Sequence, residues 1–209
     1  MITIKSVPEI RDDGRGYKMI DSGGVEIEVS QFLWGLIRIL KPKRCLTTGI
    51  YTGISDLYIA DALKENGYGY TDALEYEPKH IERANSLWNE YAVDSYIKPH
   101  LISSLDFNPE GVYEFMFLDT EPQIRFAELV KFYPHLVEGG YVFIHDLEGH
   151  LGQEDIRNPD HPDFKYWPWG ELPREIQKWL REDQLRMMSF PNPRGMVGFY
   201  KVKGKDYQS

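Results

Sequence analysis

Short apolar stretches alternate with amphipathic helical patterns along the middle of this chain, and this alternation constrains the fold more than any other feature. A short apolar run is typical of a buried strand, whereas apolar residues at three- and four-residue spacing are typical of a helix. Strands that alternate with helices of about 10–15 residues indicate βαβ units and a mainly parallel sheet. The strands are predicted at 44–48, 70–76, 95–102, 112–119 and 141–145, and the helices at 29–40, 55–65, 78–91 and 125–136.

The C-terminal part of the chain follows a different pattern. A helix is predicted at 172–182, followed by two strands at 184–190 and 196–203. The turn between these strands is short enough for an antiparallel hairpin. The sequence therefore predicts an α/β fold: a Rossmann-like, doubly wound sheet of seven strands, mostly parallel, that ends in a C-terminal antiparallel hairpin.

Length and composition favour one globular domain. A chain of 209 residues with 42% apolar and 27% charged residues can bury a core and is not typical of a disordered protein. No internal repeat, low-complexity tract or long linker divides it, so we expect residues 1–209 to form a single domain. Within it, the Gly- and Asp-rich residues 1–28 are predicted to be an irregular lead-in.

Charge and cysteine content restrict partners and compartment. The formal net charge of −9 disfavours a nucleic-acid partner, because such binding depends on Lys and Arg neutralising phosphates. The lone Cys45 cannot form an intramolecular disulfide, and no apolar run approaches the roughly 18 residues that span a bilayer. The N-terminus also lacks a signal-peptide pattern. We expect a cytoplasmic protein that binds neither nucleic acid nor membrane, and the N-terminal segment and aromatic residues are compatible with a homodimer.

A glycine-containing turn at 48–53 follows the first predicted strand. Gly49 and Gly53 would let the backbone approach a ligand, and the next helix, with Ser55 as its expected N-cap, would direct free N–H groups at it. The alternative, that the glycines only turn a strand into a helix, has about equal support. The G-x-x-x-G spacing lacks the G-x-G-x-x-G pattern of nicotinamide enzymes, which makes an oxidoreductase the weaker interpretation.

Glu75 stands at the end of the second predicted strand. An acidic side chain at this place can accept hydrogen bonds from both hydroxyls of a ribose. Its neighbour Glu77 is a rival for that role, and a solvated carboxylate near a strand end is the alternative without function. We take Glu75 as the candidate nucleoside ligand.

The order and spacing of these features resemble class I S-adenosylmethionine-dependent methyltransferases over roughly residues 25–203. The segment 46–55 (LTTGIYTGIS) is similar to the strand-turn-helix of small-molecule O-methyltransferases of the catechol and caffeoyl-CoA type. Other landmarks of that family are matched by Glu75, by Asp119 in FLDTE, by Gly139-Gly140, and by His145-Asp146. The resemblance implies S-adenosylmethionine as cofactor and a small-molecule acceptor.

The resemblance also assigns a cofactor pocket. Its residues would be Thr47, Gly49, Tyr51, Gly53, Ser55, Glu75, Ser104 and Asp119, with Ser104 near the adenine. One departure stands out: the family usually has an acidic residue where this chain has Thr47, which can hydrogen-bond but carries no charge. This departure keeps open a degenerate, non-catalytic cofactor-binding or scaffold protein of the same fold.

Asp119, His145 and Asp146 end two consecutive predicted strands and are the candidate catalytic residues. In the metal-dependent O-methyltransferases that the chain resembles, matching positions hold Mg²⁺ beside the acceptor hydroxyl, whose pKa a bound cation lowers. A divalent cation such as Mg²⁺ or Mn²⁺ at these three residues is one hypothesis, in which His145 shifts the preference away from Mg²⁺. In the metal-free alternative, His145 is the general base and Asp119 or Asp146 orients it.

Two further features each allow two interpretations. Glu121 and Arg125 are four residues apart and could form a surface pair, or Arg125 could face the site. The loop at 148–170 is rich in Pro and Trp and is predicted to be a lid or substrate loop, with a plug or dimer contact as the alternative. The chain is thus predicted to O-methylate a small-molecule hydroxyl, with N-methyl transfer as a rival, because fold alone does not fix the reaction.

Overall fold

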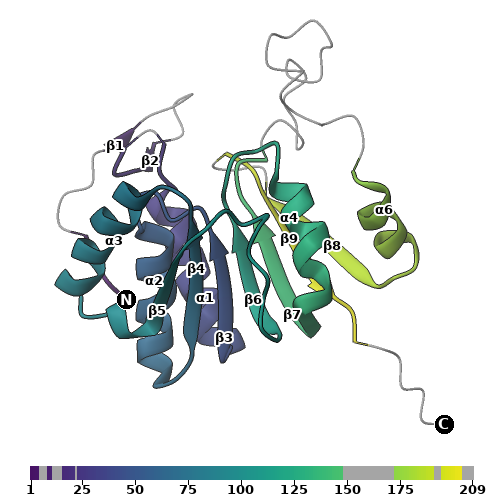
Figure 1. Cartoon of the computed structure of the whole chain (residues 1–209), viewed down its shortest axis with the longest axis horizontal. Coiled ribbons are helices and arrows are strands. Elements are labelled where there is room, and N and C mark those ends of the chain that lie inside the picture. Colours follow the sequence, from purple (N-terminus) through teal and green to yellow (C-terminus); the bar gives the residue numbers. More distant parts are fainter. Residues whose placement is uncertain (5–8, 11–15, 22, 148–171, 191–193, 204–209) are drawn as a thin grey trace, which may run out of the picture. The chain divides into compact units, whose positions relative to one another are not determined.

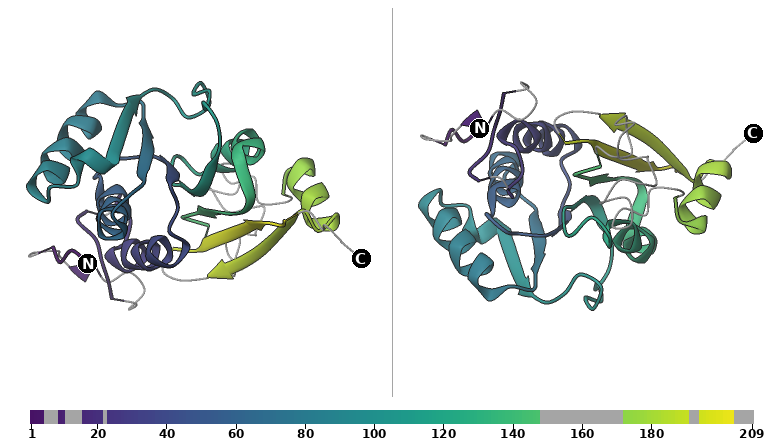
Figure 2. Two further views of the ribbon diagram at one scale, coloured as in Figure 1. Left: turned by 90° about the horizontal axis from the view of Figure 1, so that it is seen from below. Right: turned by 90° about the horizontal axis from the view of Figure 1, so that it is seen from above.

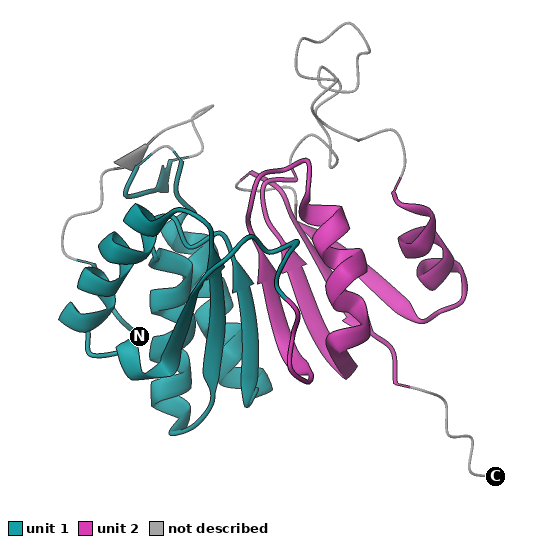
Figure 3. Cartoon of the chain, in the orientation of Figure 1, with its two compact units in different colours: residues 1–107 teal, residues 108–209 magenta. Residues whose placement is uncertain are grey.

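The computed structural model describes residues 1–4, 9–10, 16–21, 23–147, 172–190 and 194–203. The chain divides after residue 107 into two compact units, each with its own strands and helices (Figure 3). Each unit also has its own buried apolar side chains. The first unit is Met1–Phe107 and the second is Asn108–Ser209. The predicted lid at 148–170 lies outside the described residues.

The first unit contains three parallel strands in the order β5-β4-β3 (Figure 1). They are β3 (Arg44–Thr48), β4 (Tyr70–Glu75) and β5 (Ile97–Leu101), the last preceded by the 3₁₀ turn η1 (Asp94–Tyr96). Helices α1 (Ile27–Leu40), α2 (Ile54–Asn66) and α3 (Pro78–Glu90) lie on one face of these strands (Figure 2). The carboxyl ends of the three strands therefore share one edge of this unit.

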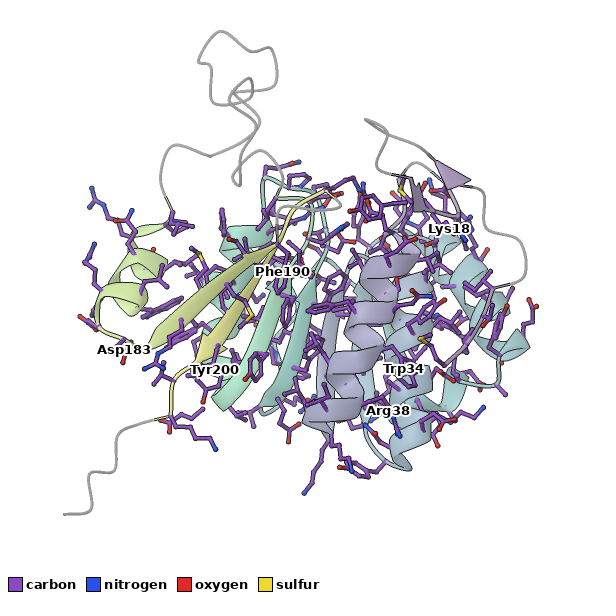
Figure 4. The ribbon with its side chains drawn as sticks, turned by 180° about the vertical axis from the view of Figure 1, so that it is seen from behind. Lys18, Trp34, Arg38, Asp183, Phe190 and Tyr200 are labelled. Carbon is purple, nitrogen blue, oxygen red and sulfur yellow. The ribbon has the colours of Figure 1, made fainter. Side chains whose placement is uncertain are left out.

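Helix α2 is the central helix of the first unit, packed against α1 and β4. Its first ten residues are all buried, and it ends at Gly67, whose left-handed backbone caps the helix and whose N–H bonds the Leu63 carbonyl. Side chains from α1 reach the same helix: Trp34 Nε1 donates to Asp61 Oδ2 at 2.8 Å. One turn further along α1 lies Arg38, also labelled in Figure 4. These contacts fix the two helices against each other.

The N-terminal lead-in is less irregular than predicted. The two-residue strands β1 (Glu9–Ile10) and β2 (Tyr17–Lys18) pair in antiparallel orientation. Strands this short show no alternation of apolar and polar residues from which they could be predicted. Helix α1 then begins at Ile27, two residues before the predicted start. The predicted N-cap of α2 was also wrong, because the cap residue is Gly53 rather than Ser55.

The second unit contains four strands in the order β6-β7-β9-β8. They are β6 (Tyr113–Leu118), β7 (Leu136–Ile144), β8 (Leu185–Phe190) and β9 (Met196–Lys201). Strands β6 and β7 are parallel, whereas β9 is antiparallel to both β7 and β8. Helix α4 (Arg125–Phe132), followed by the 3₁₀ turn η2 (Tyr133–His135), and helix α6 (Arg174–Arg181) lie on one face of these strands (Figure 2).

Strand β7 starts earlier than the sequence suggested. Gly139 and Gly140 were predicted to precede the strand, but both lie inside it. Gly139 has φ +82°, and the pairing of β7 with β6 shifts register between Tyr113 and Phe115. The glycines thus produce an irregularity within the strand and do not end the preceding structure.

The predicted fold class is confirmed. Besides the short β1–β2 pair, the described residues of the two units contain seven strands of an α/β fold, parallel except where β9 pairs with its neighbours, and the last two strands are antiparallel as predicted. The largest fully buried side chains include Trp88 and Tyr58 in the first unit and Phe115 and Phe143 in the second. None of the helices described combines the length and apolar character that crossing a membrane requires.

Candidate active site

The turn between β3 and α2 is fixed by backbone hydrogen bonds. Gly49 N donates to the Leu74 carbonyl at 3.0 Å, and Gly53 N donates to the Ile50 carbonyl at 2.7 Å. Gly49 and Gly53 have φ of +79° and +76°, and between them Tyr51 has φ +45°. A left-handed backbone costs a non-glycine residue roughly 1–2 kcal/mol, so the contacts around Tyr51 must hold it there.

Gly53 is required by packing, whether or not a ligand binds. A Cβ atom at this position would lie 2.6 Å from Ala84 Cβ and 2.9 Å from Trp88 Nε1, both on α3. The same Trp88 nitrogen donates to the Gly53 carbonyl at 2.9 Å. Ser55 follows in the first turn of α2 and is buried. The glycine at 53 is thus explained by the close approach of α3, and its cofactor role remains a prediction.

Glu75 ends β4 with its carboxylate beside the glycine turn. Its Oε2 accepts a hydrogen bond from Tyr51 N at 3.1 Å, and its Oε1 accepts from Tyr76 N at 2.9 Å and Glu77 N at 3.0 Å. A carboxylate offers about four acceptor positions, so these three donors leave capacity for a ligand hydroxyl. The rival Glu77 is more exposed, and its carboxylate lies 3.8 Å from Lys79 Nζ.

Two buried polar atoms of the first unit form no hydrogen bond among the described residues: Ser104 Oγ, and His80 Nδ1, which lies only within ion-pair distance of Glu75. His80 Nδ1 lies 3.3 Å from Glu75 Oε2, and its ring meets Tyr51 edge-on at 5.0 Å. Ile102 N donates to the Glu75 carbonyl at 2.9 Å, which brings the segment carrying Ser104 alongside. A buried polar atom without a partner costs about 1–3 kcal/mol, so this arrangement suits a polar ligand such as a nucleoside.

The N-terminal segment contacts the ring of Tyr51. Arg83 lies over this ring at 5.9 Å and pairs with Asp21 at 3.3 Å. Burial, followed by the Asp21 carboxylate, raises the pKa of the Tyr51 phenol, and Arg83 opposes this shift. A Cβ atom on Gly23 would lie 3.0 Å from the Tyr51 hydroxyl. The strained Tyr51 is therefore held on several sides at once.

Thr47 faces a carboxylate that the sequence analysis missed. Its Oγ1 donates to Asp56 Oδ1 at 2.5 Å, and both residues are buried. Asp56 lies in the first turn of α2, where an acidic residue interacts favourably with the helix dipole. The position at which the resemblance expects an acidic side chain thus has a carboxylate as its hydrogen-bond partner.

The second unit brings Asp119, His145 and Asp146 together. Leu118 pairs with Ile144 in the parallel ladder, so the residues that follow these two strand ends are neighbours. His145 Nδ1 lies 3.3 Å from Asp119 Oδ1 and 3.5 Å from Asp146 Oδ1. The imidazole is fully buried, whereas the side chains of Asp119 and Asp146 are 13% and 22% exposed. The two carboxylates are therefore the groups of this trio that a ligand can touch.

Arg125 joins this trio from the start of α4. Its guanidinium Nη2 lies 3.2 Å from Asp119 Oδ1 and 3.5 Å from Asp146 Oδ2. It also donates to the backbone carbonyls of Thr120 and His145. The side chain is only 4% exposed. This burial excludes the predicted surface pair with Glu121 and favours the alternative, in which Arg125 faces the site.

The trio has a donor set that a metal could use, because one ligand atom from each residue lies within 4.8 Å of the others. Two carboxylates and an imidazole suit Mn²⁺, Fe²⁺ or Zn²⁺ better than Mg²⁺. The guanidinium groups of Arg125 and Arg194 are already in contact with these carboxylates, with Arg194 Nε 3.1 Å from Asp146 Oδ1. Two positive charges about 4 Å apart repel by roughly 4 kcal/mol at an effective dielectric constant of about 20. The trio therefore offers metal ligands, but two guanidinium groups already neutralise its carboxylates.

Asp56, His80 and Arg194 were not singled out from the sequence. An acidic residue in the first turn of a helix is a common helix feature, so Asp56 gave no specific signal. His80 follows Glu75 by five residues, and only the start of α3 places it beside that carboxylate. Arg194 reaches Asp146 from a distant part of the chain.

The middle of the chain is similar to a known protein family. A family model described as a methyltransferase domain matches residues 46–147. A curated relative from Dictyostelium discoideum, named "Probable caffeoyl-CoA O-methyltransferase 3", is 26% identical over 99 residues. That match spans 44% of this chain and 39% of the relative, about two fifths of its length.

Solved structures of similar fold cover most of the chain. The methyltransferase PaMTH1 of Podospora anserina, solved with SAH bound, has a TM-score of 0.69 at 19% identity and covers 87% of this chain and 81% of its own. The O-methyltransferase TomG of Streptomyces achromogenes, in complex with SAM, has a TM-score of 0.69 at 20% identity, with 86% and 82% covered. An O-methyltransferase of Bacillus cereus in complex with SAH has a TM-score of 0.68 at 16% identity, with 88% and 84% covered. At these identities the likeness shows the fold.

Proposed function

We propose that this chain, whose residues 46–147 match a methyltransferase domain model, transfers a methyl group from S-adenosylmethionine to a hydroxyl group of a small molecule. S-adenosylmethionine supplies an electrophilic methyl group on a sulfonium. The reaction is an in-line displacement at that carbon, and positioning of the two reactants provides most of the acceleration. The complexes of PaMTH1, TomG and the Bacillus cereus enzyme with SAM or SAH support the choice of cofactor.

The observation that carries the proposal is the carboxylate of Glu75. Three backbone N–H groups hold it at the end of β4, next to the glycine turn. In dinucleotide-binding folds an acidic residue at this place accepts hydrogen bonds from ribose hydroxyls. The buried atoms His80 Nδ1 and Ser104 Oγ would complete the polar surroundings of the nucleoside, and Gly49 and Tyr51 would supply the turn near the methionine end.

The acceptor half of the reaction is assigned to the second unit. Asp119 would accept the hydrogen bond of the acceptor hydroxyl, with His145 behind it. As the new O–C bond forms and the S–C bond breaks, the hydroxyl proton would pass to the Asp119–His145 pair. The imidazole nitrogen next to the carboxylate gives the proton a second acceptor. Asp146 would orient the acceptor through its partly exposed carboxylate.

Titration calorimetry with S-adenosylhomocysteine tests the cofactor assignment. We expect the native chain to bind at micromolar concentration, and Glu75→Ala to weaken binding by about 10–100-fold through loss of 1–3 kcal/mol of charged hydrogen bonding. Glu77→Ala is the matched control, because it removes the more exposed neighbouring carboxylate. Native binding that Glu75→Ala leaves intact would refute the assignment of Glu75, and no binding at all would favour the non-catalytic alternative.

The remaining features of the proposal rest on the sequence. A net charge of −9 favours a small acceptor over a nucleic acid, and a cytoplasmic location agrees with the single cysteine. We also infer that residues 1–209 act as one domain and that 148–170 serves as the substrate loop. A homodimer is compatible with these features, and sedimentation of the full chain would decide it.

A further inference from the structure

The cluster of Asp119, His145 and Asp146 in the second unit contains a positive charge that belongs to the chain itself, the guanidinium of Arg125. Arg125 is almost fully buried at the start of α4, and a single nitrogen, Nη2, lies within 3.5 Å of carboxylate oxygens from both Asp119 and Asp146. Such a guanidinium does what a bound cation does: it neutralises and spaces the two carboxylates. Arginine suits this position because its planar fork binds several oxygens at once and stays charged.

Further contacts show that the guanidinium is fixed in this position. Arg125 Nε donates to the Thr120 carbonyl at 2.7 Å, and Nη1 donates to the Asp146 carbonyl at 3.3 Å. Thr120 in turn donates through Oγ1 to Glu128, a buried residue of the same helix, at 2.8 Å. The backbone at both strand ends is therefore tied to one side chain, which cannot leave without breaking several hydrogen bonds.

The conformation of Asp146 depends on the same arrangement. Asp146 has φ +54°, a left-handed backbone that is unfavourable for a residue with a Cβ atom. Arg125 contacts one of its carboxylate oxygens and Arg194 contacts the other, Nε to Oδ1 at 3.1 Å. Leu147 N then donates to the Gly195 carbonyl at 2.9 Å. Two guanidinium groups thus face the two carboxylates that a divalent cation would need.

We propose that Arg125 takes the place of the divalent cation at the Asp119, His145 and Asp146 trio, so that the site works without a metal. Arg125 is a positioning residue: it acts on the acceptor through Asp119 and Asp146 and not by direct contact. The inference rests on the proposed function for its chemical meaning, but metal binding can be measured whether or not methyl transfer is detected. Its failure is therefore distinguishable from failure of the proposed function.

The test is Mn²⁺ binding, followed by electron paramagnetic resonance on the full chain after chelator treatment. We expect the native chain to show no saturable binding at millimolar Mn²⁺. Arg125→Met should create a site that binds at least about tenfold tighter, because one of the two repelling guanidinium groups is removed while the three ligands remain. Arg125→Lys retains the positive charge and should bind no more Mn²⁺ than the native chain.

Two variants separate this role from a merely structural one. Arg44→Met is the matched control: it frees another buried carboxylate, Asp72, from a guanidinium at 2.9 Å and should create no Mn²⁺ site. Combining Arg125→Met with Asp119→Asn should abolish the new site. If Arg125→Met does not fold, as judged by its thermal melt, the native chain decides alone: saturable Mn²⁺ binding that Asp119→Asn removes would overturn the proposal, and its absence at millimolar Mn²⁺ supports it.

Discussion

Thr47 and Asp56 are nine residues apart in the chain and are joined by one hydrogen bond of 2.5 Å in the core of the first unit. The threonine hydroxyl donates, and the aspartate carboxylate accepts. A buried carboxylate is expensive to desolvate, and each donor that it has reduces that cost. Thr47 is uncharged, and the carboxylate at this place is supplied by Asp56 of the following helix α2.

Replacing the hydroxyl tests this interpretation. Thr47→Val keeps the shape of the side chain but removes a donor from buried Asp56, and we expect it to lower the free energy of unfolding by about 1–3 kcal/mol. Urea denaturation measures the change. Thr71→Val is the control, because the Thr71 hydroxyl is equally buried but makes only a 3.5 Å contact with a backbone carbonyl. An equal decrease in the free energy of unfolding in both variants would show that the hydrogen bond to Asp56 does not contribute to stability beyond the loss of a buried hydroxyl.

At the level of secondary-structure elements, helix α2 makes a pH-dependent contribution to the free energy of unfolding through the buried Tyr58. Tyr58 on α2 is 1% exposed. Desolvation by burial raises the pKa of its phenol, with smaller contributions from Tyr91, Asp61 and Glu28, and a hydrogen bond with Gln31 on α1 opposes the shift. The folded chain thus keeps the Tyr58 proton at pH values where the unfolded chain loses it.

The sign of the effect follows from that difference. The stabilisation is fully present below the ordinary tyrosine pKa of about 10 and is lost as pH rises through the raised pKa of the folded state. In Tyr58→Phe this contribution is absent, so the free energy of unfolding should fall less steeply between neutral pH and pH values above about 10. Denaturant titrations at a series of pH values check this. An alkaline slope identical to that of the native chain would contradict the assignment to Tyr58.

For the whole molecule, the open question is whether the two compact units unfold together. Cys45 on β3 reports on the first unit, because it is fully buried and reacts with a thiol reagent only when the strand opens. Trp179 on α6 reports on the second, since its ring stacks on Tyr133 at 3.7 Å. A single domain predicts one cooperative transition for both reporters.

We therefore expect the urea midpoint of Cys45 labelling to coincide with that of the fluorescence change that disappears in Trp179→Phe. S-adenosylhomocysteine at about 100 times its dissociation constant should slow the labelling by about 100-fold, if labelling proceeds through global unfolding. Two separate midpoints would instead make the units independent domains. Protection of Cys45 alone would place ligand stabilisation in the first unit.

Much of the fold and part of the site could be predicted because they depend on local patterns. Alternating apolar stretches predicted the strands and helices, and Glu75, Asp119 and His145 were identified because each ends a strand or directly follows one. The start of β7 was predicted wrongly, since glycines at 139–140 indicate a break locally. Pairing with β6 overrides that preference, and a sequence pattern does not contain the partner.

What the sequence by itself determined is the set of elements, their order and the residues at their ends, because side-chain period and turn residues act over a few neighbouring positions. Only the tertiary structure decided which charges meet. Arg125 turned out to bind Asp119 and Asp146, and Thr47 to bind Asp56, because strand register and helix packing set the direction of each side chain. Electrostatic contacts depend on distance in space. The sequence alone therefore did not reveal that the Arg125 guanidinium lies beside the two carboxylates that a metal ion would bind.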